Sequence, residues 1–246
     1  MKPISIQCYQ NSMLSSSAIP LFPSNICEFG GALEALVYQQ IRFLSKQIYY
    51  DGHTINAARL SYTRLQKHIP AVTRRTIIKV IADLKNCGAI FVYQTKRVNL
   101  LSINDGYQFK TKNDDKADAA MLVFPALLMK LTLLETIALQ QIHMRCIGYD
   151  GSYWMIRTCS QLQSQIFPFV SLATVSRLVA SLRRKELIFV KPYQSDDGPV
   201  NSYRVNYKGV AELLGLPVPE VLPPVAKHFG KWTDPVYPVG QSLALT

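Results

Sequence analysis

Residues 70–92 of the chain read PAVTRRTIIKVIADLKNCGAIFV, and residues 168–190 read PFVSLATVSRLVASLRRKELIFV. The two stretches align without a gap at an offset of 98 residues, and 8 of the 23 aligned positions are identical. Upstream, EALVYQQI (residues 34–41) corresponds to ETIALQQI (residues 135–142), and Tyr-Asp-Gly recurs at residues 50–52 and 149–151. The repeat predicts two similar small domains, since each copy is long enough to fold around its own core.

The composition of the segments around the repeat predicts five parts. The parts are an N-terminal extension (residues 1–30), a first domain (31–109), a polar linker (110–120), a second domain (121–207) and a proline-rich tail (208–246). The extension is rich in Ser, Pro and Asn and has room for one short element. A tail with this much proline is not expected to pack as a domain, so it is either an interaction arm or a disordered segment.

The charge is strongly positive and concentrated in the repeated unit. The chain of 246 residues has a formal net charge of +11. Residues 59–97 hold nine basic residues and one acidic residue, and residues 157–191 hold six basic residues and one acidic residue. A concentrated excess of this sign favours a polyanionic partner such as nucleic acid.

The hydrophobic spacing and turn residues predict the same order of elements in both copies: helix, helix, turn, helix, hairpin. For the first copy the expected helices are Ala32–Gln47, Ser61–Lys67 and Thr73–Asn86, with a hairpin of Ala89–Gln94 and Val98–Ile103. For the second they are Leu133–Met144, Cys159–Gln165 and Ser171–Lys185, with a hairpin of Leu187–Lys191 and Ser202–Asn206. This order is typical of the winged helix–turn–helix. The expected fold class is therefore mainly α with small β-hairpin wings (α+β), arranged as two tandem winged helix–turn–helix domains.

The third helix of each copy is the expected DNA-reading element. Its apolar stripe should face the core, which leaves a basic face outward. Arg and Lys side chains can contact phosphates or guanine edges, and the hairpins add further basic residues. The expected DNA-binding residues are Arg74, Arg75, Thr76, Lys79, Asn86, Lys96, Arg97, Ser171, Thr174, Ser176, Arg177, Arg184, Lys191 and Arg204.

Some residues of the unit are expected to have other roles. The aromatic residues Phe91, Phe189 and Trp154 are expected in the core. The pair Arg74-Arg75 is replaced by Leu172-Ala173 in the second copy. The second helix start therefore either contacts fewer phosphates or is part of a protein interface.

Three motifs of the second copy occur in the order ETIALQQIH (residues 135–143), DGSYWMIRT (150–158) and FPFVSLATVSRLVASLRRKELI (167–188). With these motifs the second copy resembles the winged-helix domain of phage and plasmid replication proteins. The first copy is similar more loosely, since it has IPA in place of FPF and lacks the tryptophan. The resemblance implies sequence-specific binding of duplex DNA, and two such units in one chain are similar to plasmid replication initiators that bind repeated origin sites.

Enzymatic function is not expected. No phosphate-binding loop motif occurs, and the histidines are scattered without metal-ligand spacing. The five cysteines form no CxxC pair, which favours reduced thiols in a cytoplasmic protein. We therefore expect no catalytic residue, cofactor, metal or membrane, and duplex DNA as the partner, with self-association or replication and transcription proteins as further partners. The alternatives left open are a transcriptional regulator, including one that regulates its own promoter, and a winged-helix adaptor that binds proteins.

Overall fold

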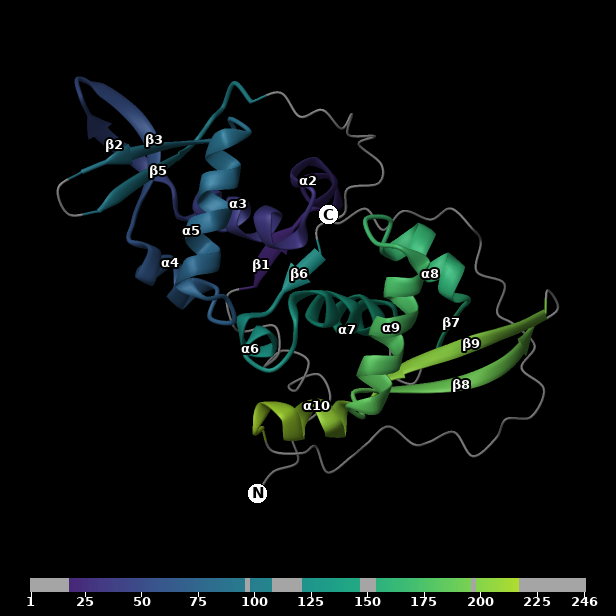
Figure 1. Ribbon diagram of the computed structural model, residues 1–246. Coiled ribbons are helices and arrows are strands. Elements are labelled where there is room, and N and C mark those ends of the chain that lie inside the picture. The colour runs from purple at the N-terminus through teal and green to yellow at the C-terminus, as the bar shows by residue number, and fades with distance from the viewer. Residues whose placement is uncertain (1–17, 96–97, 108–120, 147–153, 196–197, 217–246) are drawn as a thin grey trace, which may run out of the picture.

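The computed structural model describes residues 18–95, 98–107, 121–146, 154–195 and 198–216. This part of the chain is an α+β structure with nine helices and three small antiparallel sheets (Figure 1). The two repeats lie side by side, with the N-terminal one at the upper left of the view. No helix in the described ranges has the length and apolar content needed to cross a membrane.

The first repeat builds a four-stranded sheet beside three helices. Its elements are α3 (Ala32–Leu44), β2 (Lys46–Tyr50), β3 (His53–Leu60), α4 (Tyr62–His68), α5 (Arg74–Asn86), β4 (Ile90–Gln94) and β5 (Asn99–Ile103). The strand order is β2-β3-β5-β4. Helix α3 is buried along most of its length, because α5 packs on one side of it and strands β3 and β5 on another.

The second repeat has the same order of helices and a smaller sheet. Its elements are α7 (Leu133–Cys146), β7 (Met155–Arg157), α8 (Cys159–Ile166), α9 (Leu172–Arg184), β8 (Ile188–Ser195), β9 (Gly198–Val205) and α10 (Tyr207–Leu214). The strand order is β7-β9-β8. Helix α7 occupies the place that α3 has in the first repeat, packed against α9 and β9.

The first helix of the first repeat is shorter than its sequence predicts. It ends at Leu44 instead of Gln47, because residues 46–50 form β2 and pair with β3. The turn between them consists of Asp51 and Gly52, whose φ angles of 49° and 81° suit a tight two-residue hairpin. The sequence predicted a continuous helix up to Gln47, so strand β2 was missed.

A two-strand ribbon joins the repeats. Strand β1 (Ile19–Leu21) pairs antiparallel with β6 (Met121–Val123), with Pro20 opposite Leu122. Each strand is followed by Phe-Pro and a short helix that begins at the proline, α2 (Pro23–Phe29) and α6 (Pro125–Leu128). Because β1 and β6 are equivalent strands and pair antiparallel, an approximate twofold rotation relates the two repeats. In Figure 1, α5 and α9 accordingly run in opposite directions.

The repeats share one core. Buried side chains from both halves, including Leu21 and Val123 of the ribbon, belong to a single hydrophobic cluster. Ordered elements also precede residue 31 and follow residue 207, since β1 and α2 pack on α3 and α10 follows β9 directly. The domain boundaries drawn from the sequence stay predictions, and the linker they place at residues 110–120 lies outside the described residues.

Candidate nucleic-acid interface

Helix α5 divides into a buried stripe and an exposed basic side. Its apolar positions Ile77, Val80, Ile81 and Leu84 are all buried, as predicted. The opposite side exposes Arg74, Arg75, Lys79 and Asn86 to solvent. These four residues lie on the outward side of the helix, which also carries the exposed Ile78.

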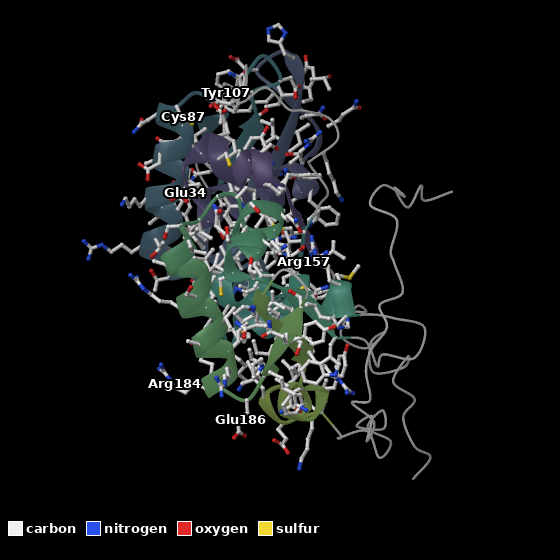
Figure 2. All side chains as sticks on the ribbon, turned by 90° about the vertical axis from the view of Figure 1, so that its right-hand side faces the viewer. Glu34, Cys87, Tyr107, Arg157, Arg184 and Glu186 are labelled. Carbon is white, nitrogen blue, oxygen red and sulfur yellow. The ribbon has the colours of Figure 1, made fainter. Side chains whose placement is uncertain are left out.

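Helix α9 repeats this division with fewer charges. Val175, Leu178 and Leu182 are buried. The outward residues Ser176, Arg177 and Arg184 are exposed, and Figure 2 shows Arg184 projecting from the outer side of the helix.

Four hydroxyl groups at the helix starts act within the protein. The Thr73 hydroxyl accepts a hydrogen bond from the Thr76 N–H and lies 2.8 Å from the Thr76 hydroxyl. Ser171 and Thr174 form the same arrangement at the start of α9, with their hydroxyls 3.0 Å apart. Thr73 and Ser171 are the N-caps of α5 and α9, and their hydroxyls satisfy backbone donors of the first helical turn. Thr76 and Thr174 are half-buried, and their hydroxyls contact the capping hydroxyls at the helix starts.

The predicted wing residues do not form one group. Lys96 and Arg97 lie outside the described residues. Lys191 is exposed, and its ammonium lies 5.1 Å from the centre of the Trp154 ring. Arg204 is only 8% exposed, so little of its side chain is open to a duplex, and its predicted contact with DNA phosphates stays a prediction. Arg204 lies on the central strand β9, on a face of the sheet that it shares with Phe189 and the start of α10.

Three aromatic residues expected in the core are outside it. Phe91 and Phe189 are 46% and 47% exposed, and Trp154 is half-buried. In β4, Ile90 is buried and Phe91 is exposed, since successive side chains of a strand point to opposite faces. The sequence pattern could not reveal which face the helices cover.

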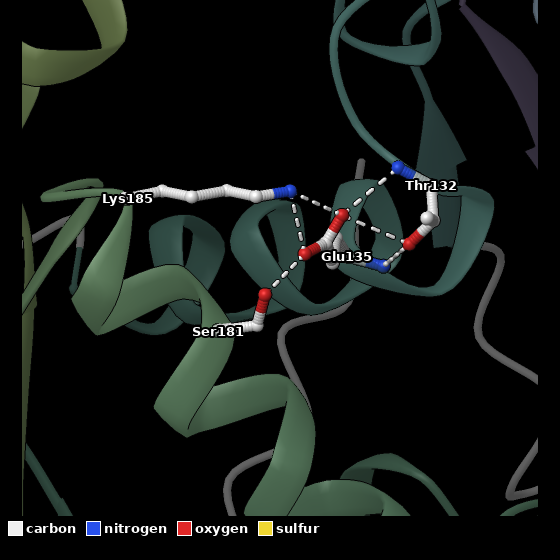
Figure 3. A network of polar contacts seen from close by, with 4 residues as sticks. All are labelled: Thr132, Glu135, Ser181 and Lys185. Atoms are coloured by element: carbon white, nitrogen blue, oxygen red, sulfur yellow. Dashed lines mark hydrogen bonds and ion pairs between the residues drawn. The ribbon is translucent and has the colours of Figure 1, made fainter.

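A buried carboxylate holds α9 against α7 (Figure 3). Glu135 accepts hydrogen bonds from the Lys185 ammonium at 2.8 Å and from the Ser181 hydroxyl at 2.6 Å. At the start of α7 it also accepts the Thr132 N–H at 3.0 Å, while its own N–H donates to the Thr132 hydroxyl, a capping box. Burial alone would raise the pKa of Glu135, but the hydrogen bonds from Lys185, Ser181 and Thr132 outweigh it and lower the pKa to about 2.

These contacts of Glu135, which we call the Glu135 clamp, were not predicted from the sequence. The repeat aligns Glu34 with Glu135, but the residues matching Ser181 and Lys185 are Asp83 and Cys87. Only the second repeat therefore has a hydroxyl and an ammonium in position to bind the carboxylate. A Thr-x-x-Glu pattern before an apolar run was the available signal.

The two basic helix surfaces face the same way. In Figures 1 and 2, α5 and α9 both lie on one side of the molecule, and the ribbon of β1 and β6 lies between the repeats. Arg157 lies away from this side in Figure 2. The arrangement places two exposed basic helices on one side of the molecule, above a common hydrophobic core.

The described ranges contain no group of three or more His, Cys, Asp or Glu residues able to hold a metal ion. Cys27, Cys87, Cys146 and Cys159 are not joined in disulfides. Comparison of the chain with protein-family models, with curated proteins and with solved structures finds no match in any of the three.

Proposed function

We propose that the chain consists of two tandem winged helix–turn–helix domains that bind duplex DNA by sequence, through α5 and α9. One observation carries the proposal. In both repeats the equivalent helix buries its apolar stripe and exposes a basic side, with Lys79 and Arg177 at the same position of the repeat. Burial of the stripe does not require a positive charge there, so its presence in both copies favours an anionic partner.

In the proposed complex each helix enters a major groove. Arginine can bind the O6 and N7 atoms of guanine in a bidentate manner, and lysine can bind the same edge or a phosphate. The surface of α5 has Arg74 and Arg75 where α9 has Leu172 and Ala173. The two half-sites should therefore differ in sequence, with more phosphate contacts at the half-site under α5.

The pairing of β1 with β6 supports a particular orientation of the half-sites. The approximate twofold rotation that relates the repeats would also relate the DNA they contact, because a duplex has local twofold axes of its own. The half-sites should lie in inverted orientation about one helical turn apart. Their spacing would follow from the ribbon and the shared core.

The biological role proposed for this binding is initiation of plasmid or phage replication at repeated origin sites. The support is the resemblance of residues 131–207 to winged-helix domains of replication proteins. A transcriptional regulator would use the same interface, so the number of sites in the bound DNA distinguishes the two. Several repeated sites favour an initiator, whereas one site at a promoter favours a regulator.

The alternative of a protein-binding adaptor has an observation of its own. Leu172 is 48% exposed at the start of α9, and Ile78 is 37% exposed on α5. Apolar side chains at these places suit a protein interface better than a phosphate backbone. The basic residues around them favour DNA binding over the adaptor. A steep salt dependence of binding would distinguish DNA binding from the adaptor function.

Replacing Arg75 and Lys79 by alanine together tests the DNA interface. Losing two phosphate or base contacts should weaken binding to a cognate duplex by at least about tenfold and reduce the steepness of its salt dependence by about 2. Fluorescence anisotropy of labelled duplexes at several salt concentrations measures both. If ~6 phosphates are neutralised, log K should fall against log salt with a slope of about −5.

The matched control removes two positive charges elsewhere. Arg157→Ala with Lys208→Ala takes both from outside α5 and α9, and it should leave affinity for the cognate duplex nearly unchanged. Equal weakening in the two double variants would mean that the net charge alone attracts DNA. Unchanged binding by the Arg75 and Lys79 variant would overturn the assignment of α5.

A further inference from the structure

A hollow of about 390 Å³ lies at the base of the β8–β9 hairpin, between the sheet and the first turn of α10. Tyr203 and Val205 of β9 face the core, so Arg204 between them faces the other side of the sheet. Phe189 lies directly opposite Arg204 in the strand register and shares this side with it. The hollow therefore combines a cationic group with aromatic walls.

The side chain of Arg204 is largely buried, and its Nε atom has no hydrogen-bond partner in the described part of the chain. The residue is 8% exposed. The ion pairs found in the described part of the chain, Lys185 with Glu135 and Lys208 with Glu212, do not involve it. A buried charge is costly unless it is paired, so this position favours an anion from outside the chain.

The start of α10 offers donors to the same hollow. The side chain of Asn206 does not cap the helix but donates to the Glu186 carbonyl at 2.6 Å. The first bond of the helix runs from the Val210 N–H to the Asn206 carbonyl, so the N–H groups of Lys208 and Gly209 have no partner within the helix. Uncapped N–H groups at the positive end of a helix dipole attract anions, phosphate above all.

The rim adds two further kinds of contact. The Phe189 ring is about half exposed and can take a flat ring against it. Glu186 also lines the hollow, and it adopts a φ of 57° where the first repeat has glycine. Its carboxylate would repel an anion placed beside it, but it can accept hydrogen bonds from sugar hydroxyls.

We propose that this hollow binds a nucleotide. The phosphate lies between Arg204 and the first turn of α10, the sugar hydroxyls reach Glu186, and the base packs against Phe189. The volume lies within the range of small-molecule sites. The site is separate from the outer surfaces of α5 and α9: in Figure 2 Glu186 lies near α10, below the end of α9 from which Arg184 projects. Nucleotide binding and DNA binding can therefore succeed or fail independently.

Fluorescence of Trp154 reports on this hollow, because its ring lines the wall. In a chain carrying Trp232→Phe, Trp154 is the remaining tryptophan, and AMP should change its emission saturably. Inorganic phosphate should compete with AMP. Adenosine should bind at least about tenfold more weakly than AMP, because it lacks the charged phosphate. Arg204→Gln should weaken AMP binding by at least about tenfold, whereas Arg184→Gln on the outer side of α9 should not. No saturable response to AMP at millimolar concentration, or equal AMP affinity in Arg204→Gln, overturns the proposal.

A second variant keeps the test valid if Arg204→Gln fails to fold. Lys208 is exposed, so Lys208→Glu should fold and place a negative charge at the start of α10, which should weaken AMP binding. Unchanged affinity in this variant also overturns the proposal. A 5′-phosphorylated trinucleotide distinguishes the sources: binding like that of AMP identifies the end of a strand as a ligand, and binding of AMP alone identifies a free nucleotide.

Discussion

At the residue scale, Glu186 and Gly88 occupy the same place in the two repeats. Both follow the end of the third helix and adopt a positive φ, 57° for Glu186 and 83° for Gly88. Glycine adopts this conformation freely, whereas a residue with a Cβ is strained by about 1–2 kcal/mol. The second repeat therefore keeps a strained glutamate where the first has the relaxed residue.

Replacing Glu186 by glycine should stabilise the protein. Glycine removes the backbone strain energy of the folded state, and this gain exceeds the entropic cost of a more flexible unfolded chain. We therefore expect the free energy of unfolding to rise by about 1 kcal/mol. Urea denaturation measures it. The reciprocal control, Gly88→Ala, should lose a similar amount, and a loss of stability in Glu186→Gly would show that the glutamate side chain makes a stabilising contact.

The Glu135 clamp makes a second prediction at this scale. Because its pKa is lowered from 4.5 to about 2, the carboxylate form stabilises the fold fully above pH 4.5, and the contribution is lost as the pH falls from there toward 2. Glu135→Gln should cost about 1–3 kcal/mol at pH 7, since Lys185 loses its partner. The difference in urea stability between the variant and the unmodified chain should shrink as the pH is lowered through this window; a constant difference would argue against the ion pair.

At the element scale, α10 is tied to α7 by a buried pair. The Nδ1 atom of His143 lies 3.0 Å from the Tyr207 hydroxyl, and the two rings meet edge to face. Burial lowers the pKa of His143 from 6.5 to about 4, so the folded state holds the neutral imidazole. The contact fixes the start of α10, and with it one wall of the hollow beside Arg204.

Acid should loosen this attachment. The unfolded chain binds a proton at His143 below pH 6.5 and the folded chain only near pH 4, so stability should fall as the pH drops through that range. His143→Phe keeps a ring in place and removes the titration, so its stability should change less than that of the unmodified chain between pH 7 and 5. Identical pH profiles from thermal unfolding would show that another group dominates.

At the scale of the whole molecule, the ribbon and the shared core hold α5 and α9 in one geometry. A cognate duplex with five additional base pairs between its half-sites turns one half-site by about half a helical turn, away from its helix. We expect the affinity for this duplex to fall by at least about tenfold. Ten additional base pairs should turn the half-site back toward its helix but leave it too far away for both helices to bind at once. Anisotropy with the three duplexes tests this, and equal affinities would mean that the repeats bind independently.

Features that depend on residues close together in the sequence could be predicted, whereas features that depend on distant residues could not. Thr73 as a helix cap, the buried stripe of α5 and the order of helices and hairpins follow from neighbours a few residues apart, which a sequence pattern records directly. The β2–β3 hairpin and the ribbon were missed, because a short strand is stable only beside a partner. The partner of β1 is about a hundred residues away in the sequence.

The sequence by itself determined that the chain contains one unit twice, which helix of each unit has an exposed basic side, and where most elements begin and end. Only the tertiary structure decided that the two units share a core about an approximate twofold, that Phe91 and Phe189 face outward, and that Arg204 is buried with its Nε unpaired among the described residues. Periodicity shows that a helix or strand has two faces, but which face is covered depends on elements brought together from distant parts of the chain.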